Sequence, residues 1–540
     1  MAMKGHDVFE PIGFDAFGIH SENFAIQRGE HPATLTARNI DRFRVQLQRM
    51  GNRFDWRQAV ETTSPDYYRW TQWIFVQLFK AGLAVRKKAP VNWCPTDRTV
   101  LADEQVIDGR CERCDSPVAQ RELEQWFLRI TAYADRLLDN LDRLDWSDVV
   151  KTAQRRWIGR AADKTYRLRD WLISRQRYWG TPIPIIYCER CGMVPVPEEQ
   201  LPVRLPDVRD WTPRPTGSSP LADVPAFVHT QCPTCGGAAR RETDVADNFL
   251  DSAWYYLRYP SAQLADVPFE PRLTAKWLPV SMYIGGAEHS VLHLLYSRFI
   301  CMALHDLGFV DFEEPFVRFR AHGLLSLNGG KMSKSRGNVV NPDAYVQRYG
   351  ADVLRLYLMF LGPFDQSGDF SDSGINGIAR FVQRMWRVVV QPERVADERE
   401  QLHRLIAHVT EDVSALRYNT AIAALMGYVN SRSAVSEEAA QVLPRLLAPF
   451  APHLAEELWA RLSQPYSVHQ QPFPVAEAAL LGQRTQRVAV QVNGRTRGAI
   501  QLIPGASEAD AIAAARAVVP TPSAGRVVYV AGRVLNFVTS

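Results

Sequence analysis

Apolar residues recur at helical spacing in two stretches near the start of the chain. Between residues 35 and 50 they follow a period of about 3.6 residues, and Gly51 ends the run. A second helix is predicted from Ser64-Pro65, a cap followed by a first-turn proline, to Gly82. Ahead of both helices, apolar residues between 8 and 12 predict a short buried strand that enters a glycine-rich turn.

The second half of the chain predicts many helices and then a small mixed unit. Residues 378–470 are rich in helix formers with apolar periodicity, which is typical of a helical bundle. Further along, valines alternate over 488–492 into Asn493-Gly494, a strong signal for a type I′ hairpin turn. Ser507-x-x-Asp510 then caps an alanine-rich helix. The last predicted strands are 527–530 and 534–538.

Bulk composition narrows the class of protein without identifying it. A chain of 540 residues is expected to hold several domains, and 46% hydrophobic with 23% charged residues describes an ordinary soluble protein. No apolar run is long enough to span a bilayer and no secretory leader is visible, so a cytoplasmic location is expected. A net charge of +4 is too small to indicate nucleic acid by itself. Basic pairs are either solvated or phosphate contacts: Arg155-Arg156, Arg167 with Arg169, Arg175 with Arg177, and Arg495 with Arg497.

Seven of the eight cysteines have the spacing of metal ligands. Two Cys-x-x-Cys knuckles predict one tetrahedral zinc site, with reduced thiols as the alternative. The ligands of that site are Cys188, Cys191, Cys232 and Cys235. A second, weaker site has three thiols and Asp97 in the place of a fourth ligand, and a degenerate knuckle is the alternative. Its thiols are Cys94, Cys111 and Cys114.

A loop from Gly330 to Asn338 carries two lysines, Lys331 and Lys334, separated by two residues. Small residues let such a loop approach a polyphosphate, and the ammonium groups can offset the charge that develops as a bond to phosphorus breaks. A solvated surface turn is the alternative reading of the loop alone.

Another motif, Gly285-Gly286-Ala287-Glu288-His289, also has a spacing suited to nucleotides. The glycines permit close backbone approach, and Glu288 can accept hydrogen bonds from ribose hydroxyls. His289 and His293 are spaced by one helical turn, which predicts that they share a face. That spacing is open to a zinc pair or to two residues of a substrate pocket.

The order of these motifs along the chain resembles that of the class I aminoacyl-tRNA synthetases, and specifically the bacterial leucyl-tRNA synthetase family. The resemblance covers nearly the whole chain. It is carried by Gly13-Phe14-Asp15-Ala16-Phe17-Gly18, Val91-Asn92-Trp93-Cys94-Pro95, Gln125-Trp126-Phe127, Arg167-Leu168-Arg169-Asp170-Trp171, Ser174-Arg175-Gln176-Arg177-Tyr178-Trp179-Gly180, Ser252-Ala253-Trp254-Tyr255-Tyr256, Tyr283-Ile284-Gly285-Gly286-Ala287-Glu288-His289, His293 and the lysine loop.

The resemblance implies an α/β fold in three parts. The first, residues 1–377, is a Rossmann-like class I synthetase catalytic domain, with a cysteine knuckle insert at 90–122 and a zinc-ribbon-like insert at 185–240. An α-helical bundle of the anticodon-binding type follows at 378–480, and a small C-terminal α/β domain that contacts tRNA at 485–540. The implied activity joins leucine to ATP and transfers leucyl to tRNA(Leu). ATP, Mg²⁺ and Zn²⁺ are the implied cofactors, and a monomer without a membrane partner is expected.

Site residues follow from the same resemblance, motif by motif. The implied catalytic pair is Lys331 and Lys334. The implied ATP-binding residues are Gly285, Gly286, Glu288, His322, Met332, Ser333, Lys334 and Ser335. The implied leucine-binding residues are Phe14, Asp15, Tyr255, Tyr283, His289 and His293, with Asp15 meeting the leucine ammonium. The implied tRNA contacts are Arg495 and Arg497.

Two departures from the family pattern stand out. Only residues 161–165 join the two segments between which relatives carry a large editing domain, so hydrolytic editing in cis is expected to be absent. The family's His-x-Gly-His signature does not occur in these 540 residues. The alternatives to a leucine–tRNA ligase are therefore a catalytically impaired remnant or paralogue that binds tRNA or leucine, and an enzyme that loads an amino acid onto another carrier.

Overall fold

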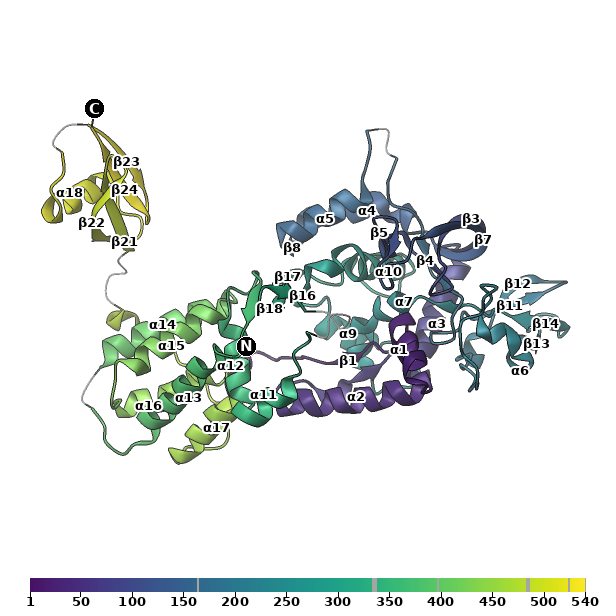
Figure 1. The fold of residues 1–540 in the computed structure, drawn as a ribbon, viewed down its shortest axis with the longest axis horizontal. Coiled ribbons are helices and arrows are strands. Elements are labelled where there is room, and N and C mark those ends of the chain that lie inside the picture. The colour runs from purple at the N-terminus through teal and green to yellow at the C-terminus, as the bar shows by residue number, and fades with distance from the viewer. Residues whose placement is uncertain (163–164, 333–337, 396–397, 482–485, 523–524, 540) are drawn as a thin grey trace. The chain divides into compact units, whose positions relative to one another are not determined.

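The computed structural model describes residues 1–162, 165–332, 338–395, 398–481, 486–522 and 525–539. These residues form two compact units (Figure 1). The first contains Met1 and His6–Asp372, and the second contains Ala2–Gly5 and the chain from Ser373 onward. None of the helices described is long and apolar enough to cross a membrane.

Parallel strands form the nucleotide-fold part of the first unit, in two separate pieces. One piece has the order β16 (Tyr283–Gly286), β17 (Arg318–His322) and β8 (Asp145–Trp146). The other pairs β1 (Gly13–Phe14) with β2 (Val60–Glu61). Within the described residues, β16 has no strand partner on the edge opposite β17, and β1 has none opposite β2.

Apolar helices pack around these strands. The central helix α10 (His293–Asp306) is buried continuously from His293 to Leu304. Helix α3 (Pro65–Lys80) begins at the predicted proline and buries its aromatic face. Helix α2 (Pro32–Arg49) begins before the predicted start, because the His31 ring accepts a hydrogen bond from the Ala33 N–H and caps it. Shorter helices complete the unit: α1 (Ile19–Arg28), α4 (Ala134–Asp139), α5 (Asp148–Ile158), α6 (Pro225–Val228), α7 (Asn248–Ser252), α8 (Tyr255–Arg258), α9 (Pro271–Trp277), α11 (Pro342–Tyr349) and α12 (Ala351–Phe360).

The strand predicted over residues 8–12 is wrong. Val8 is 51% exposed, and the strand here is the two-residue β1 that begins at Gly13. The partner strand β2 pairs only with Gly13 and Phe14, so the preceding apolar residues have no ladder to join. Pro11 also lacks the N–H that a ladder would use.

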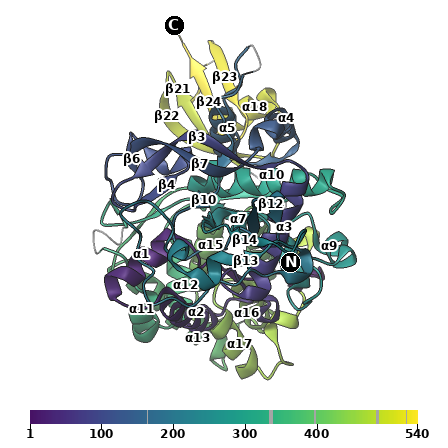
Figure 2. The same cartoon turned by 90° about the vertical axis from the view of Figure 1, so that its right-hand side faces the viewer.

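A long antiparallel ribbon of β3 (Ala84–Cys94) and β7 (Ala119–Leu128) carries the first cysteine knuckle near its end (Figure 2). Strands β4 (Thr99–Leu101) and β9 (Trp171–Leu172) flank the ribbon, in the order β4-β3-β7-β9. The small pair β5 (Val106–Ile107) and β6 (Arg110–Cys111) lies within the knuckle. Cys94 is the last residue of β3, whose first residue, Ala84, packs in the hydrophobic core of the unit.

The two Cys-x-x-Cys knuckles, Cys188 with Cys191 and Cys232 with Cys235, are built on a separate four-stranded antiparallel sheet. Its order is β12 (Gly192–Pro195), β11 (Ile185–Cys188), β14 (Ala238–Arg241) and β13 (His229–Gln231). Two further small sheets belong to the first unit: β10 (Ser174–Arg175) with β15 (Val245–Ala246), and β19 (Gly330–Lys331), β18 (Leu325–Leu327) and β20 (Gly368–Phe370).

The second unit contains the predicted helices of the bundle, with apolar faces turned inward. These helices are α13 (Ile375–Val390), α14 (Arg399–Ser414), α15 (Tyr418–Asn430), α16 (Glu437–Leu447) and α17 (Pro452–Arg461). Pro452 occupies the first turn of α17, as its position in the sequence indicates.

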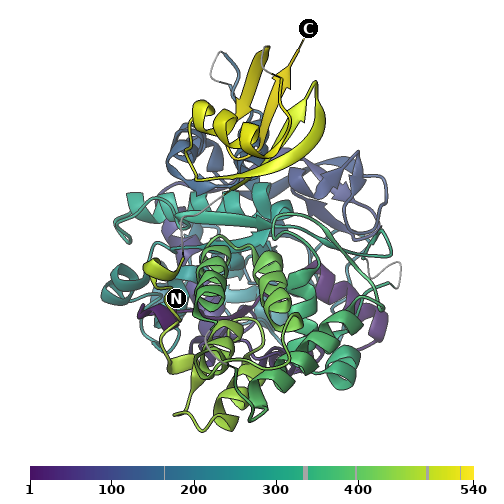
Figure 3. The same cartoon turned by 90° about the vertical axis from the view of Figure 1, so that its left-hand side faces the viewer.

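The tail of the chain matches its sequence pattern closely. It forms one four-stranded sheet, in which β21 and β24 are parallel and the outer pairs are antiparallel. The order of the strands is β22 (Arg495–Leu502), β21 (Gln486–Val492), β24 (Val534–Val538) and β23 (Arg526–Val530). Helix α18 (Glu508–Val518) packs on one face of this sheet (Figure 3). The turn has φ of 49° at Asn493 and 76° at Gly494, which confirms the type I′ hairpin, and Ser507 caps α18 with Asp510 as predicted.

Candidate active site

The carboxyl ends of the parallel strands present the residues with the clearest chemistry. Gly286 of β16 lies in register with His322 of β17, so Glu288, His289 and His322 follow two neighbouring strand ends. Asp15 follows the carboxyl end of β1. In open parallel sheets, ligands bind in the crevice outside these ends. The structure therefore places three groups of predicted site residues where such a fold binds its ligands.

Asp15 keeps some exposed surface, yet protein atoms surround its carboxyl group. Partial burial raises its pKa to about 6, while hydrogen bonds from Ser252, Thr62 and Asn248 act in the opposite direction. The carboxyl is therefore mostly ionised at neutral pH. It is suited to meet a cationic group of a ligand.

Three aromatic side chains pack together in the same region. The Tyr283 hydroxyl lies 3.1 Å from His293 Nε2, and the Tyr255 hydroxyl lies 3.4 Å from the same atom. The rings of Tyr255 and His293 are stacked, with centroids 5.6 Å apart. Burial lowers the pKa of His293 to about 3, so the ring is neutral at physiological pH. The group forms an uncharged wall with a few fixed polar atoms.

Tyr259 belongs to this group, although sequence reasoning missed it. Its ring centroid lies 5.2 Å from that of Tyr255. A Cβ on Gly13 would come within 2.7 Å of the Tyr259 hydroxyl, so the glycine lets this tyrosine approach β1 closely. The charge of Asp15 also helps to raise the pKa of Tyr259, after the larger effects of burial and Tyr283. Its spacing of four residues from Tyr255 was the available signal, because it puts both rings on one helical face.

Two of the predicted pocket residues differ from expectation. The prediction that His289 and His293 share a helical face is wrong, because His289 lies in a 3₁₀ turn and the backbone breaks at Leu292 before α10 begins. Their rings still meet edge to face at 6.4 Å, with His293 buried and His289 exposed. Phe14 contacts the guanidinium of Arg44, 5.9 Å from its ring centroid, which leaves its predicted place in the leucine pocket a hypothesis.

Glycines allow tight loops at both strand ends. A Cβ on Gly286 would lie 2.1 Å from Glu288 Oε2, so the glycine lets this carboxylate fold over the loop. A Cβ on Gly323 would lie 1.8 Å from the Gln366 carbonyl oxygen, which excludes any larger residue beside His322. The His322 Nδ1 is 2.8 Å from the Gly323 carbonyl and donates its proton there, which leaves Nε2 as an acceptor.

The base of the lysine loop is a short hairpin. Lys331 pairs with Ser326 across β19 and β18. Asp369 accepts hydrogen bonds from the Gly329 N–H at 2.9 Å and from the Ser326 hydroxyl at 2.7 Å, which anchors the hairpin. Met332 follows it, half-buried. Ser333, Lys334 and Ser335 lie outside the described residues, as does the side chain of Lys331, so the predictions for them stay predictions.

The four-thiol cluster has the geometry of a tetrahedral zinc site. All four Sγ atoms lie within 4.8 Å of one another, and those of Cys188 and Cys235 are 3.6 Å apart. Zinc–sulfur bonds of about 2.3 Å at tetrahedral angles require sulfur–sulfur separations near 3.8 Å, which fits these residues. Cys191 and Cys232 complete the set.

The three-thiol cluster fits a metal less well. The Sγ atoms of Cys94 and Cys114 are 3.4 Å apart, and Cys111 lies beside them. Asp97 is near enough to be a fourth ligand, but both of its carboxylate oxygens are already bonded. One accepts from Asn23 Nδ2 at 2.9 Å and the other from Arg113 Nε at 3.1 Å. Cys111 Sγ also donates to the second of these oxygens at 3.5 Å, so a metal ion bound here would displace bonds that Asp97 already makes.

A third cluster, in the second unit, is unsuited to a metal. His403 Nδ1 accepts the backbone N–H of Glu477 at 2.9 Å, so Nε2 carries the ring proton and donates it to Glu438 at 3.2 Å. A nitrogen that carries a proton cannot ligate a metal ion. This group instead holds the end of the bundle together.

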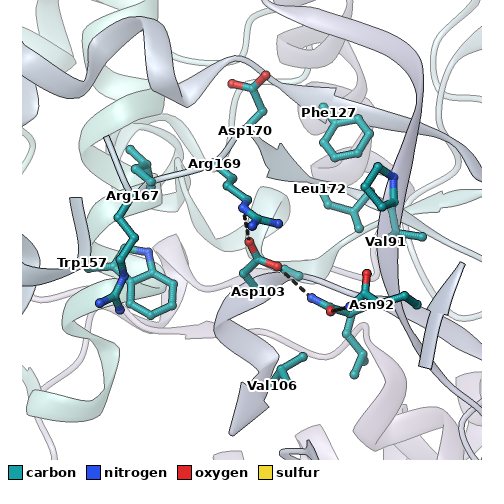
Figure 4. Close-up of a pocket in the computed structure, with 15 residues that line it drawn as sticks. Val91, Asn92, Asp103, Val106, Phe127, Trp157, Arg167, Arg169, Asp170 and Leu172 are labelled. Carbon is teal, nitrogen blue, oxygen red and sulfur yellow. Dashed lines mark hydrogen bonds and ion pairs between the residues drawn. The ribbon is translucent and has the colours of Figure 1, made fainter. Parts of the chain in front are cut away.

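A cavity of about 440 Å³ lies between the β3–β7 ribbon and residues 157–172, and none of the predicted site residues lines it (Figure 4). Asp103 accepts from Asn92 at 2.7 Å and pairs with Arg169 at 3.5 Å, and Arg167 lies over the Trp157 ring. Further along the chain, the Ala161 N–H donates to the Thr165 carbonyl at 2.9 Å, and Arg160 and Tyr166 form an antiparallel bridge.

Of the basic pairs, Arg175 and Arg177 are neither solvated nor open to phosphate. Arg175 is buried against Asp247, and Arg177 is buried against Glu22. Arg495 and Arg497 are exposed on β22, as the sequence suggested.

Comparisons with known families agree with this architecture. Residues 2–370 match the family of class I tRNA synthetases for I, L, M and V, and residues 399–512 match the anticodon-binding domain of tRNA ligases. The methionyl-tRNA synthetase of Mycobacterium tuberculosis shares the fold, with a TM-score of 0.60 at 19% identity over 94% of each chain. The first unit thus has the fold of a class I tRNA synthetase.

More similar relatives narrow the family. The leucine–tRNA ligase of Rubrobacter xylanophilus is 38% identical over 100% of this chain and 91% of its own length, and that of Thermotoga maritima is 36% identical over 99% and 92%. A leucyl-tRNA synthetase of Agrobacterium radiobacter K84, solved as a ternary complex with tRNA and LeuAMS, has a TM-score of 0.85 at 30% identity, covering 99% of this chain and 91% of that one. The chain belongs to the leucine–tRNA ligase family.

One of these alignments is much longer than this chain. The match to the Rubrobacter protein spans 746 aligned positions, whereas this chain has 540 residues. The relative therefore carries long segments that have no counterpart here. The segment 161–165, at which the editing domain is expected to be missing, is too short to form a domain.

Proposed function

We propose that this chain is a leucine–tRNA ligase, which activates leucine with ATP and transfers it to tRNA(Leu) in the cytoplasm without hydrolytic editing in cis. The observation that carries the proposal is the pairing of Asp15 with the neutral aromatic wall of Tyr255, Tyr283 and His293. An amino acid with an apolar side chain needs such a combination. The carboxylate takes its ammonium group, and the wall takes its side chain.

The nucleotide would lie at the ends of β16 and β17. Gly285 and Gly286 let it approach the backbone, Glu288 accepts hydrogen bonds from its ribose, and His322 offers an acceptor beside it. Adenylate formation requires positioned reactants and positive charge on the departing pyrophosphate, and no covalent nucleophile from the protein. Lys331 and Lys334, with Met332, Ser333 and Ser335 around them, are the proposed source of that charge, together with Mg²⁺ bound by the phosphates.

Transfer to tRNA involves the rest of the chain in this proposal. The helical bundle at 378–480 and the small domain at 485–540 would hold the tRNA, with Arg495 and Arg497 contacting its phosphates. Zinc held by Cys188, Cys191, Cys232 and Cys235 would fix the 185–240 insert. The three-thiol knuckle within 90–122 would hold zinc more weakly, because Asp97 is engaged elsewhere.

Leucine-dependent exchange of pyrophosphate into ATP tests this proposal directly. We expect exchange with the wild-type chain, and a loss of at least about a hundredfold in Lys334→Ala, because the lysine acts on charge that develops in the transition state. Lys88→Ala is the matched control, since Lys88 is an exposed lysine of the β3–β7 ribbon. Transfer of radiolabelled leucine to tRNA(Leu) extends the test to the second step.

The alternatives predict other results. A folded wild-type chain that binds tRNA but shows no exchange would favour a non-catalytic remnant. Exchange without transfer to any tRNA would favour an enzyme that loads another carrier.

A further inference from the structure

Thr62 lies at the carboxyl end of β2, directly beside the end of β1 and the turn that carries Asp15. Its side chain is nearly buried, with 3% of its surface exposed. Neither its residue type nor its position in the sequence marks it as part of a site.

Three hydrogen bonds join Thr62 to the chain around Asp15. The Thr62 N–H donates to the Phe14 carbonyl at 3.0 Å, and the Ala16 N–H donates to the Thr62 hydroxyl oxygen at 2.9 Å. The hydroxyl in turn donates to Asp15 Oδ1 at 3.3 Å. One residue thus holds the peptide groups on both sides of Asp15 and also its carboxylate.

The direction of the last bond follows because an ionised carboxylate can only accept a hydrogen bond. A threonine hydroxyl has one proton and two lone pairs. Because the Ala16 N–H already uses a lone pair, the hydroxyl proton is free to point at the carboxylate. A hydrogen bond to a charged acceptor is stronger than one to a neutral acceptor, so this arrangement favours the ionised form of Asp15.

Among the described residues, the titratable groups that face Asp15 provide no compensating cation. They are Asp247 and Asp251 from α7 and its cap, Tyr67 from α3, and Tyr259. The positive charge of Arg175 is committed to Asp247 by a buried ion pair. Neutral donors, namely Thr62, Ser252 and Asn248, are what oppose the effect of burial on Asp15.

We infer that Thr62 is a positioning residue that orients the Asp15 carboxylate for the ammonium group of the amino-acid substrate. This inference rests on the proposed function and extends it, because it names a residue that acts on the substrate only through Asp15. The ammonium group of the substrate supplies the cation that the described residues facing Asp15 do not provide.

Leucine binding to the full chain, measured by isothermal titration calorimetry without ATP, tests the inference. Thr62→Val keeps the shape of the side chain and removes the hydroxyl, and we expect it to weaken leucine binding about tenfold. Thr62→Ser keeps the hydroxyl and is the matched control, with binding within about twofold of wild type. Because the ionised carboxylate binds the ammonium, binding weakens as pH falls through the pKa of Asp15. That weakening should begin at a higher pH in Thr62→Val than in wild type, since loss of the donor raises the pKa of Asp15 further.

Equal affinity and equal pH dependence in wild type and Thr62→Val would overturn the inference and leave the proposed function untouched. No leucine binding by the wild-type chain would overturn both. If Thr62→Val does not fold, Ser252→Ala takes its place, because Ser252 also donates to Asp15. Unchanged leucine affinity and pH dependence in a folded Ser252→Ala chain would then count against a donor network around Asp15.

Discussion

The buried ion pair between Arg177 and Glu22 gives the sharpest test of how the first unit is held together. The Arg177 side chain is 1% exposed and that of Glu22 is 0% exposed. Arg177 also donates to the Asp97 carbonyl at 2.6 Å and to Asn23 Oδ1, while Glu22 accepts from the Tyr178 N–H at 3.2 Å. These bonds join helix α1, the first cysteine knuckle and the segment around Tyr178.

Arg177→Met removes the cation and keeps most of the volume of the side chain. It leaves the Glu22 carboxylate buried without a counter-charge, and breaking a buried pair in this way costs about 3–5 kcal/mol of unfolding free energy. The additional loss of the bonds to Asp97 and Asn23 favours the upper part of that range. An exposed pair such as Arg38–Glu30, in which Arg38 is 62% exposed, should cost at most about 1 kcal/mol when changed to Met.

Urea unfolding followed by tryptophan fluorescence is the assay, since most of the tryptophans lie in the first unit. The double variant Glu22→Gln with Arg177→Met should recover much of the loss, because no unpaired charge is then buried. If the double variant were as unstable as Arg177→Met alone, the reasoning would be refuted, because the loss would then come from packing and not from the stranded carboxylate.

Three other predictions follow from the site. Cys232→Ser should release about one equivalent of zinc per chain in a metal analysis, because it removes one of four thiolates, whereas Cys301→Ser should leave the zinc content unchanged. Asp15→Asn should abolish leucine binding yet raise the melting temperature at pH 7. The pKa of Asp15 is raised to about 6 in the folded chain, so folding favours the protonated form and the stability of the wild-type chain falls as pH rises through 6. A lower melting temperature of the variant would contradict this reasoning. Norvaline lacks one branching methyl group of leucine, so the chain should discriminate against it by only about 10–200-fold in exchange. Norvalyl-tRNA should be hydrolysed no faster with the chain than in buffer, and enzyme-dependent hydrolysis would show that editing occurs.

Much of the fold could be predicted from local sequence signals. The type I′ turn at Asn493-Gly494 and the cap at Ser507 were correct because they depend on only a few neighbouring residues. The strand predicted over residues 8–12 was wrong because a strand also needs a partner, and β2 reaches only Gly13 and Phe14. Apolar pattern alone carries no information about the length of a partner strand.

The site shows the same limit. Asp15, Tyr255, Tyr283 and His293 were predicted and are placed in one region. Thr62 escaped prediction because its role comes from lying beside Asp15 across two paired strands, 47 positions away along the chain. The relation of His289 to His293 was misjudged because the backbone breaks between them, and spacing alone cannot show such a break.

The short connection at 161–165 explains how the catalytic unit can lack a large insertion and keep its core. The two ends that it joins meet without it, because the Arg167 N–H donates to the carbonyls of Ile158 at 3.0 Å and Gly159 at 3.1 Å. Gly159 has φ of 58°, and a Cβ there would lie 2.7 Å from the Arg167 Cβ, so the crossing is tight and fixed by glycine. The free energy of closing a loop changes by only about 0.6 kcal/mol for each doubling of its length, so this stem tolerates either a hairpin or a domain. The contacts of the stem do not depend on the segment that it closes, so the proposed absence of editing in cis requires no change in the proposed leucine pocket around Asp15 and His293.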